Sequence, residues 1–181
     1  MSWKSYYNGE PENDDERYML MAIEEAQKCQ AQKKFGAVVV YGNRVIARAH
    51  STVLEDSDPT QHAELKVVGS TARAVSNDRS VLSSCILYTT CEPCTMCTGA
   101  ILWAYIGTVV YGMERKESMH NFWESQPWHE VILWTVSAHP KHCITIRGGV
   151  LREECARLMP PPDGSVVGNK GFFGDPYEYY N

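Results

Sequence analysis

The chain has 181 residues, of which 44% are hydrophobic and 22% are charged, and its net charge is −5 at pH 7. These values are typical of a soluble globular domain, and the acidic balance argues against nucleic acid as a partner, because nucleic-acid-binding domains are usually basic. No apolar run approaches the roughly 20 residues that span a bilayer and the N-terminus lacks a signal-peptide core, so we expect no membrane partner. The seven cysteines then indicate reduced thiols in a cytoplasmic protein.

The hydrophobic pattern predicts one domain over residues 1–181, with its core from about residue 14 to 159 and a tail over 160–181 rich in glycine, proline and aromatic residues. The expected elements, in chain order, are a helix over 14–30, strands over 35–41 and 44–50, a helix over 63–72, a strand over 85–89, a helix that begins near Cys94, a strand over 108–111, a helix over 128–138, a strand over 143–146 and a helix over 151–159.

Turn and cap residues predict how these elements connect. Gly42-Asn43 is a hairpin signal, so the first two strands should be antiparallel neighbours. Asp14-Asp15 can cap the first helix, and Thr60 or Gln61 can cap the second. An apolar crossover helix between the third and fourth strands predicts that these two strands are parallel. The order predicts an α/β fold, a three-layer α-β-α sandwich with a five-stranded mixed sheet.

One helix is expected to begin with a pair of thiols. Cys94 and Cys97 lie three residues apart after Pro93, so both should lie on one face of the first helical turn, where the helix dipole favours thiolates. Together with His62, they would form a three-ligand zinc site with an open fourth position, as catalytic zinc requires. A lone Cys-x-x-Cys is often a redox pair or half of a structural zinc site. Cys91 could complete a structural site, but we expect a buried loop thiol.

Glu64 indicates a catalytic site. It follows His62 by two residues on the first turn of a predicted helix, so its carboxylate can reach a metal-bound water without being a ligand. Zinc lowers the pKa of such a water to about 7, and a neighbouring carboxylate can take its proton and pass it to a leaving group. His-x-Glu followed by Pro-Cys-x-x-Cys is the signature of zinc deaminases.

These motifs resemble the cytidine deaminase-like superfamily, and most closely its nucleobase branch of guanine deaminases, fungal cytosine deaminases and bacterial tRNA adenosine deaminases. The resemblance covers residues 18–159, and the segments that carry it are Phe35 to Val40, Asp58 to Glu64, Cys85 to Ala100 and Gly148 to Cys155. It implies one Zn²⁺ per chain, deamination by water, and usually a homodimer or larger assembly.

The resemblance also predicts substrate contacts. In the relatives, an Asn eleven residues before the zinc His holds the base, and here that position is Ser51. The main-chain N–H groups of Ala63 and Cys94 resemble family positions that contact the base or the attacking water. His50 is expected to line the site or to be a structural histidine. Trp123 falls where relatives build the pocket wall, or else anchors a solvated loop.

We therefore predict a zinc-dependent deaminase of a small heterocyclic substrate, most like guanine deaminase. The alternatives are a deaminase of cytosine or another aminopyrimidine, a tRNA adenosine deaminase, and a non-catalytic interaction domain stabilised by zinc. The predicted loop from Met113 to Trp128 has no basic run, which argues against the tRNA reading. Trp103 and Tyr105, near the end of the cysteine helix, predict self-association as a homodimer.

Overall fold

The computed structural model describes residues 9–115 and 144–159. The strands are β1 (Gly36–Tyr41), β2 (Arg44–His50), β3 (Ile86–Cys91), β4 (Thr108–Met113) and β5 (Thr145–Arg147), and the helices are α1 (Asp14–Ala26), α2 (Ala63–Ala74), α3 (Arg79–Leu82), α4 (Thr95–Trp103) and α7 (Arg152–Ala156). The strands form one mixed sheet in the order β2-β1-β3-β4-β5. Among the described residues, no helix is both long enough and apolar enough to cross a membrane.

Two of the four strand pairings were predicted, the β1–β2 hairpin and the parallel pairing of β3 with β4. Strand β1 pairs antiparallel with both β2 and β3, while β4 runs parallel to β3 and to β5. Gly42 and Asn43 have φ values of 53° and 61°, the left-handed conformation that a two-residue hairpin turn of type I′ requires at both positions. The hairpin and the parallel crossover are therefore confirmed.

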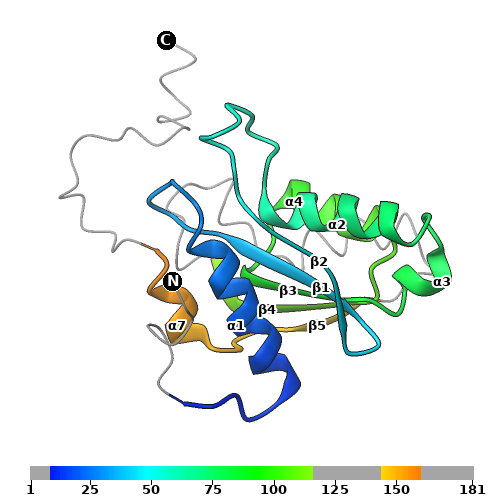
Figure 1. Cartoon of the computed structure of the whole chain (residues 1–181), viewed down its shortest axis with the longest axis horizontal. Coiled ribbons are helices and arrows are strands. Elements are labelled where there is room, and N and C mark those ends of the chain that lie inside the picture. The colour runs from blue at the N-terminus through cyan, green and yellow to red at the C-terminus, as the bar shows by residue number, and fades with distance from the viewer. Residues whose placement is uncertain (1–8, 116–143, 160–181) are drawn as a thin grey trace.

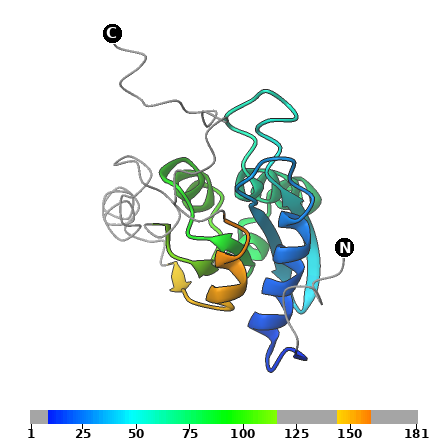
Figure 2. The same ribbon diagram turned by 90° about the vertical axis from the view of Figure 1, so that its left-hand side faces the viewer.

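Helices cover both faces of the sheet. Helices α1 and α7 lie on one face, and α2 and α4 lie on the other (Figures 1 and 2). Side chains of β1 alternate between the two layers, because Val38 and Val40 belong to the core under α1 whereas Ala37 and Val39 belong to the core under α2. Gly36 lets α1 approach the sheet closely, since a Cβ there would lie 2.1 Å from the Ala22 carbonyl oxygen. The three-layer α/β prediction is confirmed.

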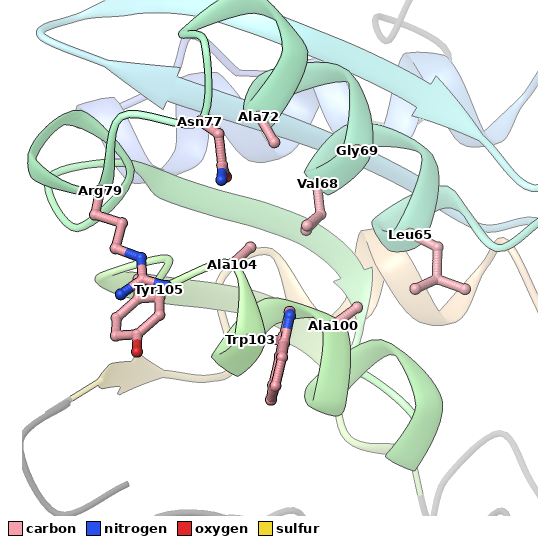
Figure 3. Close-up of a pocket in the computed structure, with 10 residues that line it drawn as sticks. All are labelled: Leu65, Val68, Gly69, Ala72, Asn77, Arg79, Ala100, Trp103, Ala104 and Tyr105. Carbon is pink, nitrogen blue, oxygen red and sulfur yellow. The ribbon is translucent and has the colours of Figure 1, made fainter.

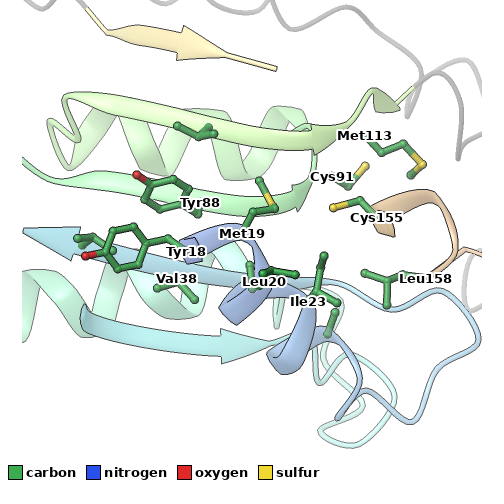
Figure 4. Close-up of a cluster of buried hydrophobic side chains, with 14 of the residues drawn as sticks. Tyr18, Met19, Leu20, Ile23, Val38, Tyr88, Cys91, Met113, Cys155 and Leu158 are labelled. Carbon is green, nitrogen blue, oxygen red and sulfur yellow. The ribbon is translucent and has the colours of Figure 1, made fainter. Parts of the chain in front are cut away.

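The core under α1 and α7 contains most of the large buried side chains. Tyr18 and Tyr88 stack with ring centroids 5.2 Å apart, and Met19, Leu20 and Ile23 fill the space beside them (Figure 4). Arg147 of β5 donates two hydrogen bonds to the Asp15 carboxylate, at 3.0 and 2.9 Å. This ion pair ties the edge strand β5 to α1 across the sheet.

Several element boundaries differ from the predicted ones. The cap of α1 is Asn13, whose side chain accepts a hydrogen bond from the Glu16 amide at 3.0 Å, and the helix ends at Ala26. The cap of α2 is His62 rather than Thr60 or Gln61. The short helix α3, capped by the Asp78 side chain, was not predicted. The helix expected over 128–138 lies outside the described residues.

Candidate metal centre

The three predicted ligands come from the first residues of two neighbouring helices. His62 is the N-cap of α2, and Cys94 is the N-cap of α4 with Cys97 in its first turn. Helices α2 and α4 contact each other on the same face of the sheet. The fold therefore brings together groups that lie more than 30 residues apart in the sequence. The Cys94 sulfur also accepts a hydrogen bond from the Cys97 amide at 3.5 Å, which fixes its direction.

The ligand atoms are close enough together to share one zinc ion, although the two sulfurs would have to move slightly apart. The Cys94 and Cys97 sulfurs are 3.4 Å apart, and the His62 Nδ1 atom lies 3.6 Å from the first and 3.5 Å from the second. Tetrahedral zinc with bonds of about 2.3 Å to sulfur and 2.0–2.1 Å to nitrogen places its ligand atoms roughly 3.5–3.8 Å apart. Three ligands leave the fourth position open, as in catalytic zinc sites.

The two thiols of the site differ in acidity. In the metal-free chain, the hydrogen bond from the Cys97 thiol, followed in importance by the proximity of His62, lowers the pKa of Cys94 to about 4. The same hydrogen bond and burial raise the pKa of Cys97. Both cysteines must be deprotonated as ligands, so binding of zinc releases a proton from the site.

Glu64 lies beside the ligands in a position suited to proton transfer. Its side chain is buried, with 5% of the residue exposed, and burial is the main reason that its pKa is raised. It interacts with His62, Cys94 and Cys97, yet it is not in the group of three residues whose atoms converge within 4.8 Å. A carboxylate next to a metal, with a raised pKa, can both accept and return a proton near neutral pH.

Cys91 is not a fourth ligand in this arrangement. It is buried in the core under α1 and α7, together with Met113 and Cys155. Within the part of the chain that the structure describes, the convergent group of possible metal ligands contains only His62, Cys94 and Cys97. The expectation of a buried thiol at position 91 is confirmed.

Ser51 is placed on the same face of the sheet as the metal ligands. Its amide donates a hydrogen bond to the Phe35 carbonyl at 3.0 Å, which extends the pairing of β2 with β1 by one residue. Ala47 and Ala49 pack against the core under α2, so the alternation of side chains puts Ser51 on that face as well. The following residue, Thr52, is tied by its amide to the carbonyl of Gln61, the residue before His62.

The structure does not bring His50 to the ligands. Its ring is on the opposite face, where Nδ1 lies 3.7 Å from a carboxylate oxygen of the buried Glu25. Lys28 and Arg48 approach the same carboxylate at 2.7 and 3.7 Å. The position matches the structural alternative for His50, and the one-residue alternation along β2 explains why it and Ser51 face opposite sides. Ala63 is fully buried at the start of α2, and Trp123 lies outside the described residues.

Two features near the site were not predicted from the sequence. Lys66 of α2 donates a hydrogen bond to the Thr52 hydroxyl at 2.7 Å, and this hydroxyl donates to the Asp56 carboxylate. These hydrogen bonds connect the loop after Ser51 to α2. Arg115 is buried against the loop that precedes Cys94. Neither contact could be predicted from a local sequence motif, because the partners lie 14 and 22 residues apart in the sequence.

Comparison with known proteins places the chain in a family. The model of the cytidine and deoxycytidylate deaminase zinc-binding region matches residues 12–113. The chain belongs to this family. The residues of the matched region include His62, Cys94 and Cys97, whose geometry fits the metal, so zinc as the cofactor is confirmed.

Relatives within this deaminase family differ in what they act on. The chain is 35% identical over 170 residues to the chloroplastic tRNA(adenine(34)) deaminase of Arabidopsis thaliana, which covers 87% of this chain and 13% of that protein. It is 40% identical over 84 residues to the guanine deaminase of Bacillus subtilis, which covers 46% of this chain and 53% of that protein. The chain thus spans a small part of the first relative and about half of the second.

A solved structure supports the same family. A structure from a study of A-to-I editing by tRNA:A34 deaminases matches with a TM-score of 0.60 at 32% identity, over 79% of this chain and 99% of that chain. The family resemblance predicted from the sequence is therefore confirmed, and the relatives compared above are named deaminases.

Proposed function

We propose that the chain is a zinc-dependent hydrolase that removes an amino group from a nitrogen heterocycle and releases ammonia. The observation that carries this proposal is the convergence of His62, Cys94 and Cys97 with the buried carboxylate of Glu64 beside them. A structural zinc site gives no reason to bury an acidic side chain next to three ligands, since an isolated buried charge is costly.

In the proposed reaction, the metal, Glu64 and the pocket residues have separate roles. Zinc, when bound, lowers the pKa of the attacking water. Glu64 would accept one proton from that water and deliver it to a ring nitrogen. It would then take the second proton, from the hydroxyl that has added to the ring carbon, and deliver it to the departing amine, so that the C–N bond breaks and ammonia leaves. Ser51 contacts the edge of the ring from the end of β2, and the amides of Ala63 and Cys94 offer further hydrogen bonds. The products are ammonia and the corresponding oxo-heterocycle.

A free base, most like guanine, is the proposed substrate, and cytosine or another aminopyrimidine comes next. The guanine deaminase relative supports this order, because it has the highest identity of the relatives compared above. Ser51 bears a hydroxyl where the relatives carry a carboxamide. A hydroxyl offers fewer hydrogen-bond contacts to a base than a carboxamide does, which favours an atypical ring as the substrate. The test is ammonia release from a panel of bases, nucleosides and pterins, with the absorbance of each product as confirmation.

A tRNA adenosine deaminase is the second candidate. It is supported by the match with the chloroplastic relative over 87% of this chain, and by the structural match at 32% identity. The experiment compares free bases with a tRNA anticodon arm that contains adenosine at the wobble position. Turnover of the RNA arm together with binding that weakens steeply with salt would favour this candidate. Absence of deamination on every substrate, with zinc bound, would favour a non-catalytic zinc-stabilised domain.

We also propose that the chain forms a homodimer through α2 and α4. Trp103 is 77% exposed at the end of α4, and beside it runs a groove of about 320 Å³ between the two helices (Figure 3). The groove is lined by Leu65, Val68, Gly69, Ala72, Asn77, Arg79, Ala100, Trp103, Ala104 and Tyr105. A projecting indole next to a groove with a largely aliphatic and aromatic lining is self-complementary under a twofold axis, because each copy offers both parts.

Light scattering at micromolar concentration tests the dimer. A mass twice the 20.4 kDa of one chain is expected for the native protein, and Trp103→Ser should shift it towards one chain. Tyr41→Ser removes another exposed aromatic, 40% exposed at the end of β1, and should leave the mass unchanged. A native mass of one chain would refute self-association.

A further inference from the structure

A buried arginine lies against the loop that carries the thiol ligands. Arg115 follows β4 by two residues and is 3% exposed, although arginine is almost always charged. Burying a guanidinium costs several kcal/mol unless hydrogen bonds and neighbouring charge compensate it. The structure must therefore contain groups that stabilise this cation.

Arg115 donates hydrogen bonds to residues 92 and 93. Its Nη1 atom donates a hydrogen bond to the Pro93 carbonyl at 3.1 Å, and its amide donates to the Glu92 carboxylate at 3.0 Å. The Glu92 amide in turn donates to the Met113 carbonyl at 2.8 Å. Three hydrogen bonds thus tie the segment before Cys94 to the end of β4. Pro93 has no N–H, so its carbonyl is its only backbone hydrogen-bonding group.

The Pro93 carbonyl and the Cys94 amide belong to the same peptide group. A charge-assisted hydrogen bond to the carbonyl fixes the orientation of this peptide and polarises it, so the Cys94 N–H becomes a stronger donor. Cys94 is the N-cap of α4, with φ −74° and ψ 168°, so the orientation of this peptide sets where its sulfur points. Arg115 therefore acts on a ligand without contacting the metal.

Charge gives a second reason for the position of Arg115. The guanidinium lies against the loop that carries the two thiol ligands, and a buried positive charge interacts strongly with the negative charge of thiolates in the protein interior. We infer that Arg115 is a positioning residue of the zinc centre, which orients Cys94 through the Pro93 carbonyl and strengthens the retention of the metal. The inference concerns zinc binding, so it holds whichever heterocycle the enzyme accepts.

Zinc affinity, measured by competition with a chromogenic chelator on the purified full-length chain, tests the inference. Arg115→Met removes the charge and the donor and should weaken zinc binding about 10–100-fold, the usual effect of losing a hydrogen-bonding partner behind a ligand. Arg115→Lys keeps the charge but not the planar fork, so it should fall between Arg115→Met and the native chain. In the cobalt-substituted protein, the thiolate-to-metal absorption band should shift in both variants.

Arg147→Met is the matched control. Arg147 also makes ionic hydrogen bonds, to Asp15 on the other face of the sheet, so its loss should lower the melting temperature. The zinc affinity of Arg147→Met should stay within about twofold of the native value, because the two sites share no partner.

The inference is overturned if Arg115→Met binds zinc as tightly as the native chain, or if Arg147→Met loses as much affinity for zinc as Arg115→Met does. If Arg115→Met does not fold, Arg115→Lys decides the question. The inference is overturned if this variant binds zinc with the affinity of the native chain and its cobalt-substituted form has an unshifted absorption band. Because no readout uses turnover, failure of the proposed deaminase activity would leave the inference standing.

Discussion

Replacement of Glu64 by glutamine should abolish turnover while the metal and the fold remain. Glutamine has nearly the same shape, and it avoids burying a charge at a residue that is 5% exposed, so the variant should fold. It cannot exchange protons. General acid–base transfer contributes about 10²–10⁴-fold, which corresponds to roughly 3–5 kcal/mol of transition-state stabilisation. The loss should be at least of this size, because one carboxylate serves several proton transfers.

Within residues 9–115 and 144–159, the two carboxylates that could be considered as replacements for Glu64 have other contacts. Glu92, the nearest acidic residue in the cysteine motif, accepts a hydrogen bond from the Arg115 amide. Glu25 is the other buried carboxylate among the described residues, and it lies on the opposite face of the sheet with Lys28, Arg48 and His50. Glu25→Gln is therefore a matched control, which changes a buried carboxylate without changing the metal centre.

The assay measures ammonia release, zinc content and melting temperature for the native chain and both variants, on the substrate that the panel identifies. Glu64→Gln should contain one zinc per chain and release ammonia at least about 10²-fold more slowly. Glu25→Gln should keep its turnover even where its melting temperature changes. Turnover by Glu64→Gln within about tenfold of the native rate would refute its role as the proton carrier and weaken the deaminase proposal itself.

Three further predictions concern the candidate ligand Cys97, the proposed substrate contact Ser51 and the loop carboxylate Asp58. Cys97→Ala should lose zinc and melting temperature together, whereas the native chain should contain about one zinc equivalent by elemental analysis. Ser51→Asn should change relative activity between substrates by about 1–3 kcal/mol of transition-state binding, and unchanged selectivity would place specificity elsewhere. Hydrogen bonds from Thr60 and Gln61 lower the pKa of Asp58, so they stabilise the fold above the unfolded-state value of about 3.9. This stabilisation is lost as the pH falls through the lower folded-state pKa, so Asp58→Asn should destabilise the chain at neutral pH and matter less below about pH 4.

The candidate ligands could be predicted from the sequence because each of the two motifs that carry them is local. Pro93 before Cys94, and Cys97 three residues later, define a helix start, and the apolar strands on either side define a crossover whose direction is restricted. The same local rules predicted the hairpin at Gly42-Asn43. Prediction was less successful for α1, which was expected to continue to about residue 30. It ends at Ala26, and the Cys29 thiol then donates to the Phe35 carbonyl at 3.2 Å, a tertiary contact that periodicity cannot reveal.

The surroundings of the ligands depend on contacts between distant residues. Alternation along β2 was available from the sequence, and it could have separated His50 from Ser51 once the α2 face was known. The partners of Lys66 and Arg115 could not be found in this way, because a cation has many possible acceptors at sequence separations of 14 and 22 residues. Sequence patterns therefore identify which groups perform the chemistry, while tertiary packing decides how firmly these groups are held.

The zinc ligands and the proposed dimer groove are built on the same two helices. His62 and Cys94 begin α2 and α4, and the groove runs between these helices, so a metal that joins their first residues also restrains the walls of the groove. Zinc binding and self-association should then strengthen each other by the same factor, as linkage requires. Sedimentation across a concentration series, with zinc-loaded and metal-free protein, should show weaker dimerisation without zinc. Equal dimer affinity in the two forms would mean that the groove does not depend on the metal, and that α2 and α4 are held in place by the sheet alone.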